Sequence, residues 1–246
     1  MKVALPVIKL EKNQKENLNN VINAIEESCT DRCDFVFFAE TTISGLIPND
    51  NASEMLQVGQ KIPGGITDRI SSACKRNSVW VSIGLLEREE NRLFDTAVII
   101  NPEGKIVMNY RRISPRWHWD HSDPNVFCQG NSVEYVDTPF GRISTLICGD
   151  FFDEEGQLDK IKVIKPDFLH LPIVRSGDSG KDYNQETWRK EDIPDYSAQV
   201  CKLGIPVFMV NYIDGEYFGG ATIFAADGCV LSSLPLWRQG ILHYEI

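Results

Sequence analysis

The chain has 246 residues and a mass of 27.8 kDa, a length that suits one large α/β domain. Apolar residues make up 42% and charged residues 24%, proportions that exclude a disordered or collagen-like chain. Lys and Arg total 25 against 35 Asp and Glu, and the resulting net charge of −10 repels nucleic-acid backbones. No apolar run approaches the roughly 18 residues that cross a bilayer, and the N-terminus turns polar too soon for a signal peptide. We therefore expect a cytoplasmic protein with no nucleic-acid or membrane partner.

The seven cysteines are odd in number and irregularly spaced, which favours reduced thiols over a secreted disulfide framework. Cys29 and Cys33 are the only close pair in the sequence, and no second pair of similar spacing completes a zinc site. We interpret both as incidental residues at the end of a helix.

Hydrophobic patterns in the first half of the chain alternate between strand-like and helix-like segments. Continuous apolar runs bounded by charge predict buried strands, and apolar residues recurring every three or four positions predict helices. The expected strands are 2–8, 34–39, 79–85, 93–100 and 105–110, and the expected helices are 13–28 and 66–76. A turn at 101–104 makes the last two strands a hairpin.

The second half continues the alternation. Strands are expected at 133–136, 142–148, 168–171, 206–211, 218–225 and 230–234, and helices at 154–164 and 185–203. Pro194 should kink or break the start of the last helix. No linker or shift in composition divides the chain, so we expect one domain over residues 1–246, of α/β class with mixed sheets.

Cys148 is the residue that bears most directly on function. It ends an expected strand and is followed by Gly149 and Asp150, so it sits on a tight strand-to-helix turn where a nucleophile is exposed at the end of a sheet. The N-terminus of the following helix favours the thiolate form. The alternative is an ordinary buried core cysteine.

Glu40 ends the strand at 34–39 and enters a polar loop. Ligand sites in open α/β sheets lie beyond the carboxyl ends of strands, and a carboxylate shielded there acquires the raised pKa that a general base needs. The alternative is a solvated glutamate at a strand end.

Three ordered blocks resemble the signatures of the carbon–nitrogen hydrolase (nitrilase) superfamily. Residues 34–45, with Glu40, resemble the first signature. Residues 104–112 resemble the second, which holds a tyrosine, an arginine and the catalytic lysine, and residues 146–150 resemble the third, which holds the nucleophilic cysteine. Segments 165–172, 197–200, 206–211 and 219–228 resemble later parts of the family, so the resemblance runs from Val3 to the C-terminus.

The resemblance implies a four-layer α-β-β-α sandwich of two mixed sheets, a homodimer, and a site that uses no metal and no organic cofactor. It implies that Glu40 is the base, that Cys148 is the nucleophile, and that the Gly149 N–H helps to hold the oxyanion. The substrate class it implies is a small amide, with nitriles and carbamoyl amines as less favoured alternatives.

The sequence departs from the family pattern at several positions. Arg112 stands where the family has its lysine, which makes the triad Glu40, Arg112 and Cys148. Gly149 replaces a commonly bulky residue and Phe152 a common arginine. Asp123 lies near the place of a second glutamate in many members and is one methylene shorter. We expect Arg112 to bind a carboxylate such as Glu40, to lower its pKa and so weaken it as a base, and thereby to slow the turnover of simple amides.

Other residues carry weaker indications. Trp117 belongs to an aromatic loop in which His118 and His121 flank an aspartate; we favour an active-site loop whose aromatics line the pocket over a metal site, because no third ligand is apparent. Ile173, just beyond an expected strand, is a second candidate pocket residue. His170 lies inside an apolar strand and is interpreted as a hydrogen-bonded core histidine.

Two further interpretations compete with the enzyme. Arg112 favours a catalytically silent relative that binds a small molecule or a protein partner, whereas the pair of Glu40 and Cys148 favours the hydrolase. An unrelated α/β binding protein would require the ordered blocks to be a coincidence. The leading prediction is a hydrolase that cleaves a small amide through a cysteine thioester.

Overall fold

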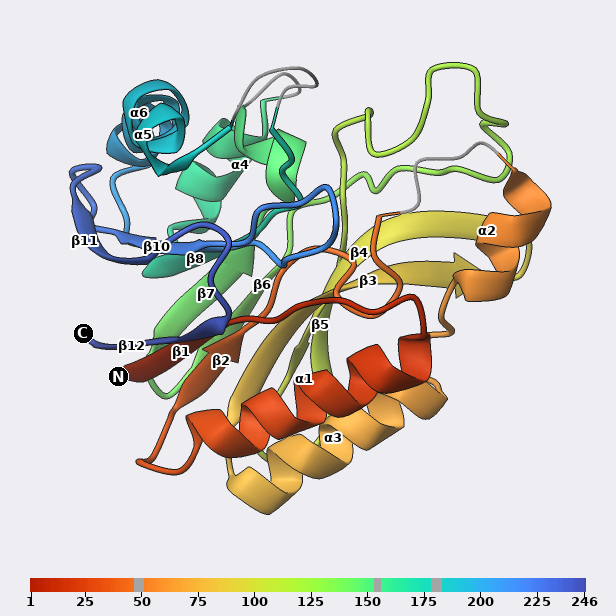
Figure 1. Cartoon of the computed structure of the whole chain (residues 1–246), viewed down its shortest axis with the longest axis horizontal. Helices are drawn as coiled ribbons and strands as arrows, with labels where there is room; N and C mark the ends of the chain where they lie inside the picture. The colour runs from red at the N-terminus through yellow and green to blue at the C-terminus, as the bar shows by residue number, and fades with distance from the viewer. Residues whose placement is uncertain (47–50, 153–155, 178–182) are drawn as a thin grey trace.

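The computed structural model describes residues 1–46, 51–152, 156–177 and 183–246. Two mixed sheets of six strands pack face to face, and helices cover both outer faces (Figure 1). This arrangement confirms the four-layer α-β-β-α sandwich expected from the sequence.

The first sheet has the strand order β12-β1-β2-β3-β4-β5. Its strands are β1 (Lys2–Val7), β2 (Phe35–Phe37), β3 (Trp80–Glu89), β4 (Arg92–Ile100), β5 (Ile106–Arg111) and β12 (Gly240–Glu245). Two helices, α1 (Gln14–Ser28) and α3 (Gly65–Asn77), lie side by side on its outer face (Figure 1). The Asn13 side chain caps α1, since its Oδ1 accepts a hydrogen bond from the Lys15 N–H at 2.9 Å.

The second sheet has the order β11-β10-β9-β8-β7-β6. Its strands are β6 (Tyr135–Thr138), β7 (Gly141–Thr145), β8 (Phe168–Pro172), β9 (Val207–Val210), β10 (Ala221–Phe224) and β11 (Val230–Leu234). Helices α4 (Gln157–Ile164), α5 (Gln185–Thr187) and α6 (Ile193–Leu203) lie on its outer side (Figure 1). A π-helical segment, Trp188–Asp192, separates α5 from α6, so the expected break near Pro194 is confirmed.

Two elements were not predicted from the sequence. Helix α2 (Ala52–Val58) lies beyond the ends of β3 and β4, and β12 pairs antiparallel with β1 along its whole length. The expected helix at 154–164 is α4, which begins at Gln157; its first two expected positions lie outside the described residues.

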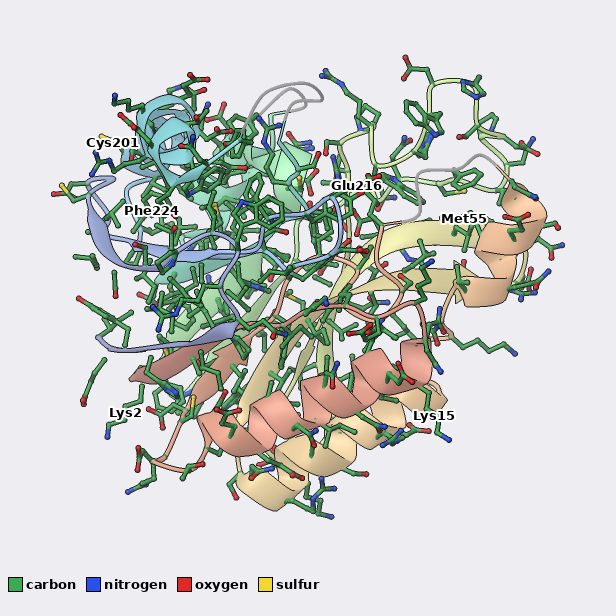
Figure 2. All side chains as sticks on the ribbon, viewed as in Figure 1. Lys2, Lys15, Met55, Cys201, Glu216 and Phe224 are labelled. Atoms are coloured by element: carbon green, nitrogen blue, oxygen red, sulfur yellow. The ribbon has the colours of Figure 1, made fainter. Side chains whose placement is uncertain are left out.

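Aromatic side chains fill the space between the sheets. Phe37 of β2 stacks on Phe208 of β9 with ring centroids 4.8 Å apart, and both side chains are fully buried. Figure 2 shows the contrast between Phe224, within the crowded interior, and Lys15, at the outer face of α1. The core therefore holds the two sheets in a fixed relation.

His170 links the two sheets directly. Its Nε2–H donates to the Phe38 carbonyl at 2.9 Å, so Nδ1 accepts from the Ser82 hydroxyl at 2.7 Å. Burial lowers the pKa of His170 to about 3, which keeps the ring neutral. The interpretation of His170 as a hydrogen-bonded core histidine is confirmed.

The direction of the strands places the site. Strands β1, β2 and β3 run parallel, as do β7, β8 and β9. Residues that follow β2 and β7 therefore leave their sheets at the carboxyl ends of parallel strands, where α/β proteins bind ligands. Glu40 and Cys148 are such residues.

Candidate active site

Glu40 lies three residues beyond β2 on a turn that packs directly against β3. The Gly84 N–H donates to the Ala39 carbonyl at 3.0 Å, and the Thr42 N–H donates to the Gly84 carbonyl at 2.9 Å. A Cβ at Gly84 would lie 2.5 Å from the Glu40 Cα, so only glycine allows this approach. Thr41, the next residue, has φ +43°, a conformation that side-chain-bearing residues rarely adopt. The turn thus fixes where the carboxyl group points.

The Glu40 carboxyl is buried and shares a cation with a second carboxyl. Its Oε1 accepts from Arg112 Nη1 at 3.0 Å, and Asp95 Oδ2 of β4 lies 3.4 Å from the same nitrogen. Burial raises the pKa of Glu40 to about 8, the nearby Cys148 thiol adds to the rise, and Arg112 opposes it. Because two carboxyls share the Arg112 guanidinium, its charge lowers the pKa of Glu40 by less than burial raises it. This differs from our expectation that Arg112 would leave Glu40 a weak base.

Arg112 follows β5 and has almost all of its donors occupied. Besides the two carboxyls, Nε donates to Ser114 Oγ at 2.9 Å and Nη2 to the Pro115 carbonyl at 3.2 Å. Burial by itself lowers the pKa of Arg112, but Glu40, Cys148, Asp95 and Asp150 raise it above the ordinary value, so the side chain stays charged. Four of its five N–H groups therefore have acceptors within the protein.

Gly149 makes room for this arginine. A Cβ at position 149 would lie 2.5 Å from Arg112 Nη2 and 3.1 Å from Ser114 Oγ. Arg112 and Gly149 are thus a sterically complementary pair. Beside them opens a pocket of about 280 Å³, lined by Arg112, Ser114, Pro115, Arg116, Gly149 and Phe152.

Cys148 begins a short 3₁₀ segment, Cys148–Phe152, which two residues separate from the end of β7. Its φ of +44° is the strained conformation of a nucleophile on a sharp turn, where such strain is typical of functional sites. The thiol is half-buried, with the Val174 carbonyl 3.8 Å from Sγ, and close enough to Glu40 to affect the pKa of that carboxyl. Glu40, Arg112 and Cys148 therefore form one cluster.

Asp150 connects the cysteine turn to the strand that carries Arg112. The carboxylate is fully buried and accepts four hydrogen bonds: its Oδ2 from the Tyr110 hydroxyl at 2.6 Å and the Ile147 N–H at 3.1 Å, and its Oδ1 from the N–H groups of Ile113 at 3.2 Å and Ser114 at 2.7 Å. Four donors on one carboxylate hold the two segments in register.

Three residues expected near the site lie elsewhere or are packed away. Asp123 is exposed, and its Oδ1 accepts from the Asn125 N–H at 2.9 Å within its own turn; among the described residues the carboxyls that contact Arg112 are Glu40 and Asp95. Trp117 is buried against Phe127 in a small core beside α2, and Ile173 is buried in the main core. None of the three lines the pocket beside Gly149.

The aromatic loop does not assemble metal ligands. His118 packs against Trp117 and Phe127, and His121 stacks on Trp119. Over the described ranges, no group of three or more His, Cys, Asp or Glu side chains is placed to hold a metal ion. Among all the residues that the structure describes, no helix has the length and apolarity needed to cross a membrane.

Sequence reasoning missed Asp95, Gly84 and Asp150. Asp95 is a charged residue within the apolar run 93–100, and a charge inside a buried strand needs a partner. Gly84 is an isolated glycine inside a strand pattern, which indicates a close backbone approach. The indications at Asp95 and Gly84 were present in the sequence, although neither of them identifies the residue that lies opposite.

Comparison with known proteins agrees with this geometry. A sequence profile described as carbon–nitrogen hydrolase matches residues 3–155. A nitrilase from Penicillium rubens is 30% identical over 273 residues, covering 93% of this chain and 79% of that protein. An (R)-stereoselective amidase from a Pseudomonas species is 29% identical over 134 residues, covering 54% of this chain and 46% of that protein.

The fold has close counterparts among solved structures. A carbon–nitrogen hydrolase from Helicobacter pylori G27 superposes with a TM-score of 0.86 at 16% identity, over 99% of this chain and 88% of that one. In sequence, by contrast, the chain aligns with only part of the first curated relatives: the aligned region spans 25% to 55% of the length of those proteins.

Proposed function

This chain belongs to the carbon–nitrogen hydrolase family, and we propose that it hydrolyses the C–N bond of a small amide through a thioester on Cys148. The observation that carries the proposal is the convergence of Glu40, Arg112 and Cys148 in one cluster near the ends of β2, β5 and β7. Relatives named amidase and nitrilase support the reaction class.

In the first half of the reaction, ionised Glu40 takes the thiol proton of Cys148. The sulfur attacks the carbonyl carbon, and its C–S bond forms as the C=O electron pair moves to oxygen. Collapse of this intermediate breaks the C–N bond. Glu40 passes the proton that it took from the thiol to the departing nitrogen, so ammonia or an amine leaves and an acyl thioester remains.

In the second half, Glu40 takes a proton from water, and the hydroxide attacks the thioester carbon. Breaking the C–S bond returns the proton to sulfur and releases the carboxylic acid. The Gly149 N–H stabilises the oxyanion in both halves. The one Arg112 N–H that has no acceptor among the described residues belongs to Nη2, the nitrogen that lies against Gly149, and it can serve as a second donor. A pocket of about 280 Å³, lined in part by Arg112 and Gly149, opens on this side of the site.

The alternative is a catalytically silent relative that binds a small molecule or a protein. The specific observation in its favour is that Glu40, Asp95, Ser114 and the Pro115 carbonyl occupy four donors of Arg112, which leaves little for an oxyanion. Losing one oxyanion donor costs about 100-fold or more in rate. On this alternative, Arg112→Lys raises amide turnover from a very low level.

A panel of small amides and nitriles, scored by ammonia release, separates the two functions. The hydrolase predicts release by the natural protein that Cys148→Ala abolishes and that Cys201→Ala, which removes an exposed cysteine, leaves unchanged. A natural protein that releases no ammonia from any member, while Arg112→Lys does, supports the silent relative.

We also propose that residues 1–246 act as one domain in a cytoplasmic homodimer. The two ends of the chain meet, because the Met1 amino group donates to the Ile246 carbonyl at 2.8 Å and β12 pairs with β1. Size-exclusion chromatography with light scattering tests the dimer, for which a mass of twice 27.8 kDa is expected.

A further inference from the structure

The active-site cluster contains a second buried carboxyl that the proposed reaction does not use. Asp95 lies on β4 with 1% of its surface exposed, and its backbone carbonyl accepts from the Arg112 N–H at 2.8 Å. Its Oδ2 and Glu40 Oε1 approach the same Arg112 nitrogen, at 3.4 and 3.0 Å. Two carboxyls therefore share one guanidinium nitrogen.

The remaining oxygens of the two carboxyls have no other donor. Glu40 Oε2 and Asp95 Oδ1 are fully buried, and no N–H or O–H group among the described residues donates to either. The two carboxyls lie side by side, because Glu40 Oε1 and Asp95 Oδ2 both approach Arg112 Nη1. An unpartnered buried carboxylate oxygen is costly, and one proton held between the two groups removes both vacancies at once.

We propose that Asp95 and Glu40 share one proton in the resting protein, and that Asp95 is a positioning residue that sets the protonation of the base. The proton lies between Asp95 Oδ1 and Glu40 Oε2, while Glu40 Oε1 accepts from Arg112. Glu40 becomes free to act as a base only when the pair loses this proton. The inference rests on the proposed function for its role in catalysis, whereas the shared proton itself does not depend on turnover.

Charge balance supports the shared proton. Two ionised carboxylates and one guanidinium would leave a net negative charge inside the protein, where unpaired charge is strongly unfavourable. One proton makes the group neutral. Burial, reinforced by Glu40, raises the pKa of Asp95 well above its ordinary value, as this arrangement requires.

The other groups around the pair do not supply the missing charge. Asp150 approaches from the 3₁₀ segment, but its carboxylate already has four donors. The phenols nearby have a pKa raised by burial and stay neutral, and His170 is neutral as well; the phenols are Tyr110, Tyr196, Tyr212 and Tyr217. Cys148 faces Glu40, and Arg112 is the cation of the group.

Infrared difference spectroscopy tests the shared proton without any substrate. At pH 7 the natural protein should show the C=O stretch of a buried protonated carboxyl group. Asp95→Asn should lose this band, because Glu40 then has Arg112 to itself and ionises; Glu40→Gln should lose it for the matching reason. Asp123→Asn, which removes an exposed carboxylate, should retain it. Cooperative unfolding of each variant checks that it is folded. No band in the natural protein, or a band that persists in Asp95→Asn, overturns the proposal.

The role in catalysis is tested by the pH profile of kcat/KM. Asp95→Asn should move the acidic limb to lower pH by about one unit or more, because a neighbour that competes for Arg112 has been removed. Asp123→Asn should leave the limb in place. An unmoved limb in an active Asp95→Asn overturns the positioning role, whereas absence of turnover in the natural protein, with the infrared result intact, overturns only the proposed function.

Discussion

Gly84→Ala should displace the Glu40 turn without touching any polar side chain of the site. The new Cβ would lie 2.5 Å from the Glu40 Cα, 2.6 Å from the Ala39 carbonyl oxygen and 2.8 Å from the Thr41 nitrogen. All three are backbone atoms, which cannot rotate away as a side chain does. The turn must therefore retreat from 2.5 Å to at least 3.4 Å, a movement of about 0.9 Å.

This movement has a cost in stability and a cost in rate. Overpacking of a buried site costs about 1–3 kcal/mol, and weakening the two hydrogen bonds between Gly84 and the turn adds about 1 kcal/mol. We expect the free energy of unfolding to fall by about 2–4 kcal/mol in total. A displacement near 1 Å of a catalytic group lowers the rate about 100-fold.

Urea unfolding and amide turnover measure the two effects. Gly65→Ala is the matched control, because no atom lies within 4 Å of its added Cβ and the residue begins helix α3. It should change stability by no more than about 1 kcal/mol, in the stabilising direction, and leave turnover unchanged. A Gly84→Ala protein within about 0.5 kcal/mol of the natural one, with full activity, would refute the claim that Gly84 positions the base.

Four other predictions follow from the site and core. Because the pKa of Glu40 is raised to about 8, the base is protonated below that pH, and kcat/KM should rise about tenfold per pH unit up to about pH 8; a flat profile from pH 6 to 8 would contradict this. Unfolded His170 takes up a proton near pH 6.5, and folded His170 does so only at about 3. The stability of the natural protein relative to His170→Gln should therefore fall by about 1.4 kcal/mol per pH unit as the pH drops between these values, measured by urea unfolding. Gly149→Ala should destabilise the natural protein but be tolerated in Arg112→Lys, and a double-mutant cycle should give a coupling of at least about 1 kcal/mol; additive effects would argue against a complementary pair. Cys148 should react with limiting iodoacetamide faster than the other six cysteines, as read by peptide mass spectrometry, and equal labelling of an exposed cysteine would count against activation.

Much of the fold could be predicted because burial leaves a local pattern. The apolar runs that became β2 and β8 are buried on both faces, which identifies inner strands of a layered α/β protein. Strand β12 has no such pattern, since all of its residues except Leu242 are exposed or half-exposed, and its pairing with β1 joins opposite ends of the chain. Helix α2 is short, with Met55 as its one buried residue.

The site could be predicted only in part, for a related reason. Glu40 and Cys148 follow strands, and the end of a strand is visible in the sequence. Asp95 lies in the middle of a strand, and its partner Arg112 belongs to the neighbouring strand end, so the pairing depends on register. The sequence instead pointed to Asp123 as a second carboxylate, because position along the chain was the available guide.

Hydrolysis through a thioester requires that Cys148 carry the acyl group of the amide during turnover. Rapid quenching of the protein with a substrate amide, followed by intact-mass and peptide mass spectrometry, detects this acyl-enzyme. We expect a mass increase equal to the acyl group on the Cys148 peptide, released by water, with one ammonia or amine per acyl group and no adduct in Cys148→Ala. Amide hydrolysis that continues in Cys148→Ala, or an acyl group found on another cysteine, would rule out this mechanism.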